Sequence, residues 1–284
     1  MPHTVQNIFH RGALVNGQTP QAVAYTPQQP QQILISNAKE LVIVLLASKE
    51  GKNKLLSIAN EFENTCCRIL PGTNPVDPKN LVKTFIDAMS SEVSFPAMVA
   101  DDAYAANMLG GLSRGSNILG EDFHFNKFEI LINRPVRITQ KACFGSECTD
   151  CKGLKRVEQM VEAHRTGNAE LSVYQFQLAC TTLRCVGQIF SEYLVHCMYN
   201  GHSFDGATEV SDMMKVAGQN LESGIFGSPI DWFKDPSRGD PQPGQPFRVD
   251  TDDKGRSMSS WTPVDMNYIH KLVGRVVDSG TIAK

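Results

Sequence analysis

Three cysteines near the middle of the chain are the residues whose types and spacing best suit chemistry. The segment Cys143-Phe-Gly-Ser-Glu-Cys148-Thr-Asp-Cys151 has C-x4-C-x2-C spacing. Two thiols separated by two residues can point at one ion, and Gly145 and Gly153 give the backbone around them the freedom that such a turn needs. Because zinc prefers thiolate ligands, the segment predicts three ligands of a four-coordinate zinc site.

A fourth ligand must come from another part of the chain. His164 lies at C-x2-C-x12-H spacing, but a continuous helix rising about 1.5 Å per residue would place it roughly 20 Å from Cys151. An antiparallel helical hairpin with its turn at 167–168 instead brings Cys180 and Cys185 level with the cysteine segment. We therefore predict a structural zinc site formed by Cys143, Cys148 and Cys151 with either Cys180 or Cys185. The alternative is a set of reduced, buried thiols that hold no metal.

The spacing of the first three cysteines also resembles that of plant-type ferredoxins, and Cys180 falls near the position of that family's fourth cysteine. The resemblance covers this segment alone and would imply a redox-active iron–sulfur cluster. The residues between these cysteines show a helical pattern, whereas that family has a mostly β fold, so zinc is preferred to an iron–sulfur cluster as the occupant of such a site. A disulfide or a redox-sensing thiol pair is the remaining alternative.

Composition and charge exclude several classes of protein. A chain of 284 residues with 41% hydrophobic and 20% charged residues is expected to fold, as one large or two modest domains. The net charge of -3 disfavours nucleic acid and anionic lipid as partners. The longest apolar run, Leu41 to Ala47, is far shorter than the roughly 20 residues that span a bilayer. With no export signal at its start, the chain is expected to be cytoplasmic, with reduced cysteines.

Basic residues crowd the cysteine segment and suggest a second class of function. Phosphate groups of RNA bind such residues when they surround a metal-stabilised turn. Acidic residues are interspersed among them, which favours an ordinary solvated face instead. A metal-stabilised RNA-binding protein is therefore the alternative interpretation. The basic residues are Arg134, Arg137, Lys141, Lys152, Lys155 and Arg156.

Motifs that indicate catalysis are weak. The segment Gly111-Leu-Ser113-Arg-Gly115 matches G-x-S-x-G, but a helical pattern precedes it, whereas a nucleophile elbow needs a strand before the serine. His196, His202 and Asp205 gather at the expected end of a long helix, where the helix dipole alone favours histidine. We therefore predict a protein that is not an enzyme, with an enzyme of unrecognised class as a further alternative.

Hydrophobic periodicity predicts a mainly α fold, in which a multi-helix domain surrounds a long central helix over about 169–199. Strict alternation in Phe128, Ile130, Ile132 and then Val136 and Ile138 predicts a small β hairpin near 126–140. Apolar spacing of three and four predicts the other helices over 36–51, 55–70, 77–89, 96–109, 152–166, 263–278 and from Asp205 or Thr208 to about Ser223.

Segments rich in proline, glutamine and glycine divide the chain into three parts. Residues 1–35 are expected to form an extended Pro/Gln-rich arm. Residues 36–223 are expected to form the helical core, which includes the cysteine segment 143–151. Residues 224–284 are expected to form an irregular strap followed by a C-terminal helix that packs on the core.

The absence of a catalytic set, together with the arm and the strap, favours a non-enzymatic subunit or adaptor of a multiprotein assembly. Such a protein would act by docking to protein partners. Trp232, Phe233 and Trp261 are the expected anchors, because aromatic side chains dominate the energy of many interfaces. A component of a bacterial secretion machine and a capsid-type protein are both compatible with this interpretation.

Overall fold

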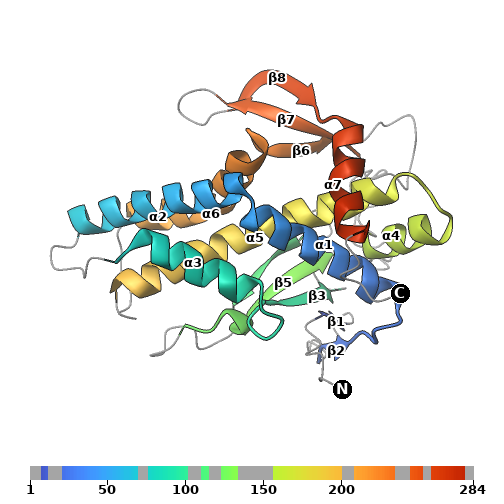
Figure 1. Ribbon diagram of the computed structural model, residues 1–284, viewed down its shortest axis with the longest axis horizontal. Helices are drawn as coiled ribbons and strands as arrows, with labels where there is room; N and C mark the ends of the chain where they lie inside the picture. The colour runs from blue at the N-terminus through green and yellow to red at the C-terminus, as the bar shows by residue number, and fades with distance from the viewer. Residues whose placement is uncertain are drawn as a thin grey trace, which may run out of the picture.

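The computed structural model describes residues 8–11, 21–69, 76–101, 110–114, 123–133, 156–199, 208–233, 244–251 and 257–278. These residues are mainly helical, as the sequence predicts, and they also form two small sheets at opposite sides of the helices (Figure 1). The helices are α1 (Pro30–Ala47), α2 (Lys49–Ile69), α3 (Pro78–Met89), α4 (Arg156–Arg165), α5 (Leu171–Tyr199), α6 (Thr208–Phe226) and α7 (Met266–Asp278). The strands are β1 (Ile8–Arg11), β2 (Val23–Ala24), β3 (Ala97–Asp101), β4 (Gly110–Arg114), β5 (Phe128–Asn133), β6 (Ile230–Phe233), β7 (Gln245–Thr251) and β8 (Ser257–Pro263).

The long central helix is α5, and its prediction is confirmed. At about 1.5 Å per residue it is roughly 43 Å long, and it runs through the middle of the molecule (Figure 1). Its apolar residues point in several directions because α1, α2, α6, α7 and the larger sheet all pack against it, as expected for a helix buried on most sides. Its fully buried side chains include Phe176, Leu183, Val186, Ile189, Phe190 and Leu194.

Two glycines allow α5 and α6 to cross in close contact. A Cβ atom added to Gly187 would lie 2.7 Å from the Cα atom of Gly218. A Cβ atom added to Gly218 would collide with the backbone carbonyl of Arg184 on α5. The two backbones therefore touch at this crossing, and side chains larger than hydrogen would separate the helices.

The first two helices meet at Ser48 rather than at Gly51, where the sequence pattern placed the end of the first helix. The Ser48 hydroxyl accepts a hydrogen bond from the backbone N–H of Gly51 at 3.0 Å and so caps the start of α2. Gly51 is needed for a different reason, because a Cβ atom there would collide with the Leu45 carbonyl of α1. The first helix also begins earlier than Ser36, at Pro30, where proline suits the first turn.

The larger sheet differs from the predicted hairpin. Its strand order is β2-β1-β3-β5-β4, with β1, β3 and β5 parallel to one another. β5 is a strand as predicted, but β3 and β4 occupy both of its edges. Residues 136–138, the expected second strand of the hairpin, lie outside the described residues, and the described partners of β5 are β3 and β4 instead.

A helix predicted over 96–109 is wrong at its start, where the chain forms β3. Its residues Met98, Val99 and Ala100 are fully buried, since β1 and β5 flank this central strand. Buried parallel strands are continuously apolar, so their periodicity cannot be distinguished from that of a buried helix. Part of the expected N-terminal arm belongs to the same sheet as β1 and β2.

Of the strap expected over 224–261, residues 224–226 complete α6, and the strands that follow form a small antiparallel sheet with the order β6-β7-β8. The sheet lies at the edge of the molecule opposite the larger one (Figure 1). The C-terminal helix that follows it, α7, is confirmed, and Ile269 and Val273 bury its apolar face against the core. Among the described helices, none combines the length and apolar character needed to cross a membrane.

Candidate docking site on the three-stranded sheet

The β6-β7-β8 sheet has one face toward the helices and one face toward solvent. Residues that pair directly across antiparallel strands share a face, so Ile230, Trp232 and Pro246 lie on the inner side. The same rule places Asp231, Phe233, Gln245, Phe247, Val249 and Trp261 on the other side, where Val249 is buried while Asp231, Phe233 and Trp261 are exposed. An antiparallel sheet with one solvated face normally places polar residues on that face. Here the exposed Phe233 and Trp261 lie on it beside the polar Asp231 and Gln245.

Three of these outer residues form an aromatic cluster, which consists of Phe233, Phe247 and Trp261. The ring centroids of Phe233 and Trp261 are 4.1 Å apart with edge-to-face geometry, and those of Phe233 and Phe247 are 5.3 Å apart. Phe233 and Trp261 each keep 41% of their surface exposed, while Phe247 is half-buried. The cluster is therefore a set of rings in mutual contact that is partly open to solvent.

Trp232 has a different role from its neighbour, because successive residues of a strand point to opposite faces. Its ring lies 5.9 Å from that of Phe176 on α5, which in turn lies 5.4 Å from the ring of Phe226 on α6. The side chain therefore attaches the sheet to the helices. Of the three predicted anchors, Phe233 and Trp261 face solvent and Trp232 packs inward.

A buried ion pair also holds the sheet in place. The Arg184 guanidinium of α5 donates a hydrogen bond from Nε to Glu222 Oε2 of α6 at 2.9 Å, and another from Nη2 to the carbonyl of Ile230 at 2.6 Å. The backbone N–H of Ile230 donates to the same carboxylate oxygen at 3.3 Å. Two helices and the first residue of β6 thus meet at one carboxylate.

Burial of the Glu222 carboxylate costs free energy, because its charge is removed from water. Glu222 is 0% exposed, whereas the Arg184 side chain keeps 33% of its surface exposed. Burial raises the pKa of Glu222, and the charge of Arg184 and the hydrogen bonds oppose that rise. Glu222 Oε1 is buried without a hydrogen-bond partner among the described residues. The network of Arg184, Glu222 and the Ile230 backbone therefore depends on the positive charge of Arg184.

The predicted zinc ligands are described in part. Cys143, Cys148 and Cys151 lie outside the described residues. Cys180 and Cys185 are buried thiols of α5, and burial raises the pKa of Cys180 well above its ordinary value and that of Cys185 to about 12. No group of three His, Cys, Asp or Glu residues that could hold a metal ion occurs within the described parts of the chain.

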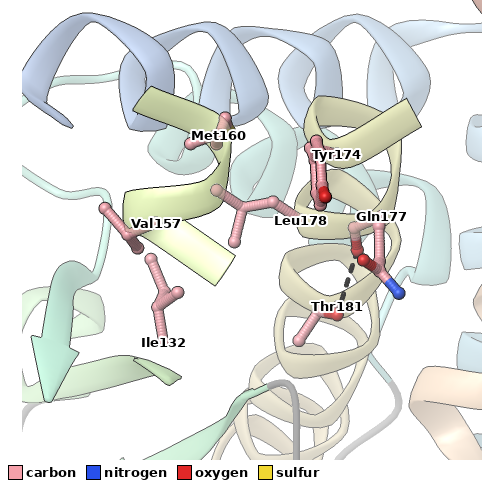
Figure 2. A pocket seen from close by; sticks show the side chains of 7 residues that line it. All are labelled: Ile132, Val157, Met160, Tyr174, Gln177, Leu178 and Thr181. Carbon is pink, nitrogen blue, oxygen red and sulfur yellow. Dashed lines mark hydrogen bonds between the residues drawn. The ribbon is translucent and has the colours of Figure 1, made fainter. Parts of the chain in front are cut away.

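A small cavity lies where α4 and β5 face α5 (Figure 2). Its volume of about 20 Å³ has room for one water molecule and is far below the size of small-molecule sites. Gln177 lines it, and both side-chain amide atoms of this residue are buried without a partner in the described residues. The nearby Thr181 hydroxyl donates to the backbone carbonyl of Gln177 at 3.0 Å. The other lining side chains are Ile132, Val157, Met160, Tyr174 and Leu178.

The residues considered for catalysis do not come together in the described structure. The His196 ring packs against that of Phe123 with centroids 5.4 Å apart, while His202 and Asp205 lie outside the described residues. Ser113 lies within β4 and pairs with Glu129 of β5. Phe247 of the aromatic cluster was not predicted, although the alternation of Phe247 and Val249 with Arg248 is a signal typical of a strand.

Comparison of the chain with protein-family models, with curated proteins and with solved structures gave no match. The assignment of function therefore rests on the residues and geometry described above.

Proposed function

We propose that the protein is a non-enzymatic adaptor that docks to a protein partner through the aromatic cluster Phe233, Phe247 and Trp261. The observation that carries the proposal is the position of this cluster on the solvent face of a sheet. Aromatic residues at the centre of an interface supply much of its binding energy. An exposed cluster on a firmly attached sheet has the features of such a centre, because its rings lose little freedom on binding.

The exposed surface is large enough to matter energetically. The exposed parts of Phe233 and Trp261 together amount to roughly 180 Å² of mainly apolar surface, given the 41% exposure of each ring. Burial of this surface by a partner would contribute about 4 kcal/mol at 25 cal/mol per Å². Lost freedom on association offsets part of this amount, so it is an upper bound, and we expect loss of both rings to weaken strongly the capture of a partner that uses them.

The test is capture of partners by the tagged full-length chain from the cells that produce it. We expect a set of proteins, identified by mass spectrometry, to be retained by the natural chain and lost with the double variant Phe233→Ser/Trp261→Ser. Val216→Ser is the matched control, because Val216 is a similarly exposed hydrophobic residue on α6. Retention of the same proteins by the double variant, with its thermal unfolding unchanged, would refute docking through this face.

We also propose that the cysteine segment contributes a structural zinc site, and that the protein is cytoplasmic. Cys180 and Cys185 are free thiols on α5, so either can supply the fourth ligand, and the cytoplasmic proposal rests on the sequence alone. The test is elemental analysis of protein purified without chelator. We expect about one zinc ion per chain, which is lost in the variant Cys148→Ser/Cys151→Ser. Iron with visible absorption would indicate a redox cluster instead, and the absence of both metals would contradict the site.

A further inference from the structure

A groove between α2 and α3 has an apolar floor and a basic rim. Its volume is about 390 Å³, which lies within the range of binding sites. Leu56 of α2 and the residues Val82 and Ile86 of α3 form the floor. Val82 belongs to the hydrophobic core, and the partly buried Leu56 and Ile86 pack against it. Three lysines lie along the rim, namely Lys52, Lys79 and Lys83.

The rim carries an excess of positive charge. The Lys83 ammonium is paired with the Asp87 carboxylate at 2.7 Å, one helical turn along α3. Lys52 and Lys79 are exposed and have no carboxylate partner among the described residues. Two uncompensated positive charges therefore flank the apolar floor, in a chain whose net charge is -3.

The groove continues along α2. A second, more open hollow of about 580 Å³ shares Asn53 and Leu56 with the first. Its remaining lining comes from the polar side of α2 and includes Asn60, Asn64 and one carboxylate, Glu61, so the excess of positive charge lies at the first hollow. Together the two hollows follow much of a helix of 21 residues, so the continuous surface suits an elongated ligand. The aromatic cluster lies on different elements, β6 to β8.

We propose that the groove between α2 and α3 binds an acidic amphipathic helix of a partner protein. Two antiparallel helices leave a groove that the side chains of a third helix can fill, and helix-in-groove binding uses apolar anchors spaced by three and four residues. Such anchors would contact Leu56, Val82 and Ile86, while carboxylates on the flanks would pair with Lys52 and Lys79. The proposal does not depend on the aromatic cluster.

The probe is a labelled amphipathic peptide of about 15 residues, roughly four helical turns, with leucines on one face and glutamates on its flanks. Its matched control has lysine in place of each glutamate. Because the chain is negative overall, non-specific attraction would favour the basic peptide. We expect the full-length protein to bind the acidic peptide more tightly in fluorescence anisotropy, and binding to weaken as salt shortens the screening length.

Variants that reverse the charge of the rim lysines test whether the peptide binds at this groove. In the variant Lys52→Glu/Lys79→Glu we expect binding of the acidic peptide to weaken by about tenfold, since two attractive pairs become repulsive. The variant Lys215→Glu/Lys271→Glu changes the net charge equally at exposed lysines of α6 and α7 and should leave binding unchanged. A photoreactive acidic peptide should cross-link to tryptic fragments of α2 and α3.

Three outcomes would overturn the proposal. The first is failure of the acidic peptide to bind at concentrations where the basic peptide does bind. The second is equal weakening by both charge-reversal variants, which would indicate a long-range effect of net charge rather than a site. The third is displacement of the peptide by a single-stranded RNA oligonucleotide that binds the same lysines more tightly, which would assign the groove to nucleic acid.

Discussion

The ion pair between Arg184 and Glu222 offers the most direct test of how the candidate docking sheet is held. Replacement of Arg184 by Met keeps most of the volume but leaves the Glu222 carboxylate buried without a cation. Loss of one partner of a buried pair costs about 3–5 kcal/mol, and the hydrogen bond from Arg184 to the Ile230 carbonyl is lost as well. We expect the free energy of unfolding to fall by about 4 kcal/mol, and Tm to fall by roughly 10 °C.

A double-mutant cycle separates the pair from its surroundings. Glu222→Leu in the Arg184→Met background removes the unpaired charge, so we expect this double variant to recover most of the lost stability. One cost should persist, because the backbone N–H of Ile230 also loses its acceptor. The measurement is urea unfolding of each variant, followed by circular dichroism and by tryptophan fluorescence.

The dependence of this destabilisation on pH distinguishes an unpaired charge from a simple loss of packing, because lost packing costs the same stability at every pH. Burial raises the pKa of Glu222 above the ordinary carboxyl value of 4.5. The stability contributed by a group with a raised pKa is present below its unfolded pKa and is lost as pH rises through its folded pKa. The destabilisation by Arg184→Met should therefore be largest near neutral pH and should shrink as pH approaches 4.5. A loss that is independent of pH, or a double variant no more stable than the single variant, would refute the reasoning.

Other predictions concern the helices and the buried thiols. Gly218→Ala should destabilise the fold by about 2 kcal/mol through collision with α5, whereas Gly274→Ala, which meets nothing within 4 Å on α7, should stabilise it by up to about 1 kcal/mol; thermal unfolding of both checks the pair. Phe85→Ala should cost about 4 kcal/mol, because this fully buried ring contacts those of Phe125 and Phe190; a loss near 1 kcal/mol in urea would contradict that packing. Cys180 and Cys185 should resist iodoacetamide at pH 8 until the protein unfolds, as mass spectrometry would show; rapid alkylation of the native chain would show that they are accessible.

The helices could be predicted from the sequence because their apolar residues recur at helical spacing. α3 is the clearest example, since Asp77 caps it through the Lys79 N–H at 3.0 Å and Pro78 occupies its first turn. Both signals are local and need no knowledge of the rest of the chain. The boundary at Ser48 was harder, because Gly51 suggests a helix end although it serves a close approach between α1 and α2.

The strands could not be predicted as well, since their signals depend on distant partners. β3 is apolar throughout because it lies between β1 and β5, which are far away in the sequence. β7 contains Pro246 near its start, opposite Trp232 of β6, and proline argues against a strand when read alone. Its backbone carbonyl still accepts a hydrogen bond from Val264 at 2.9 Å. Phe233 and Trp261 were therefore named from their residue type, whereas Phe247 and the shared face of the sheet were not predicted.

The two candidates for the fourth zinc ligand can be separated by the faces of α5. Leu178 and Thr181 line the cavity with Val157 of the first turn of α4 (Figure 2), so their face of α5 is the one that meets the start of α4. At about 100° per residue, Cys185 lies on this face one turn beyond Thr181. Cys180 is about 140° away from Cys185, and of the two thiols it is the one whose pKa the charge of Glu222 raises. If zinc is bound, we therefore expect Cys185→Ser to release it and Cys180→Ser to retain it, and the reverse result would place the cysteine segment on the opposite side of α5.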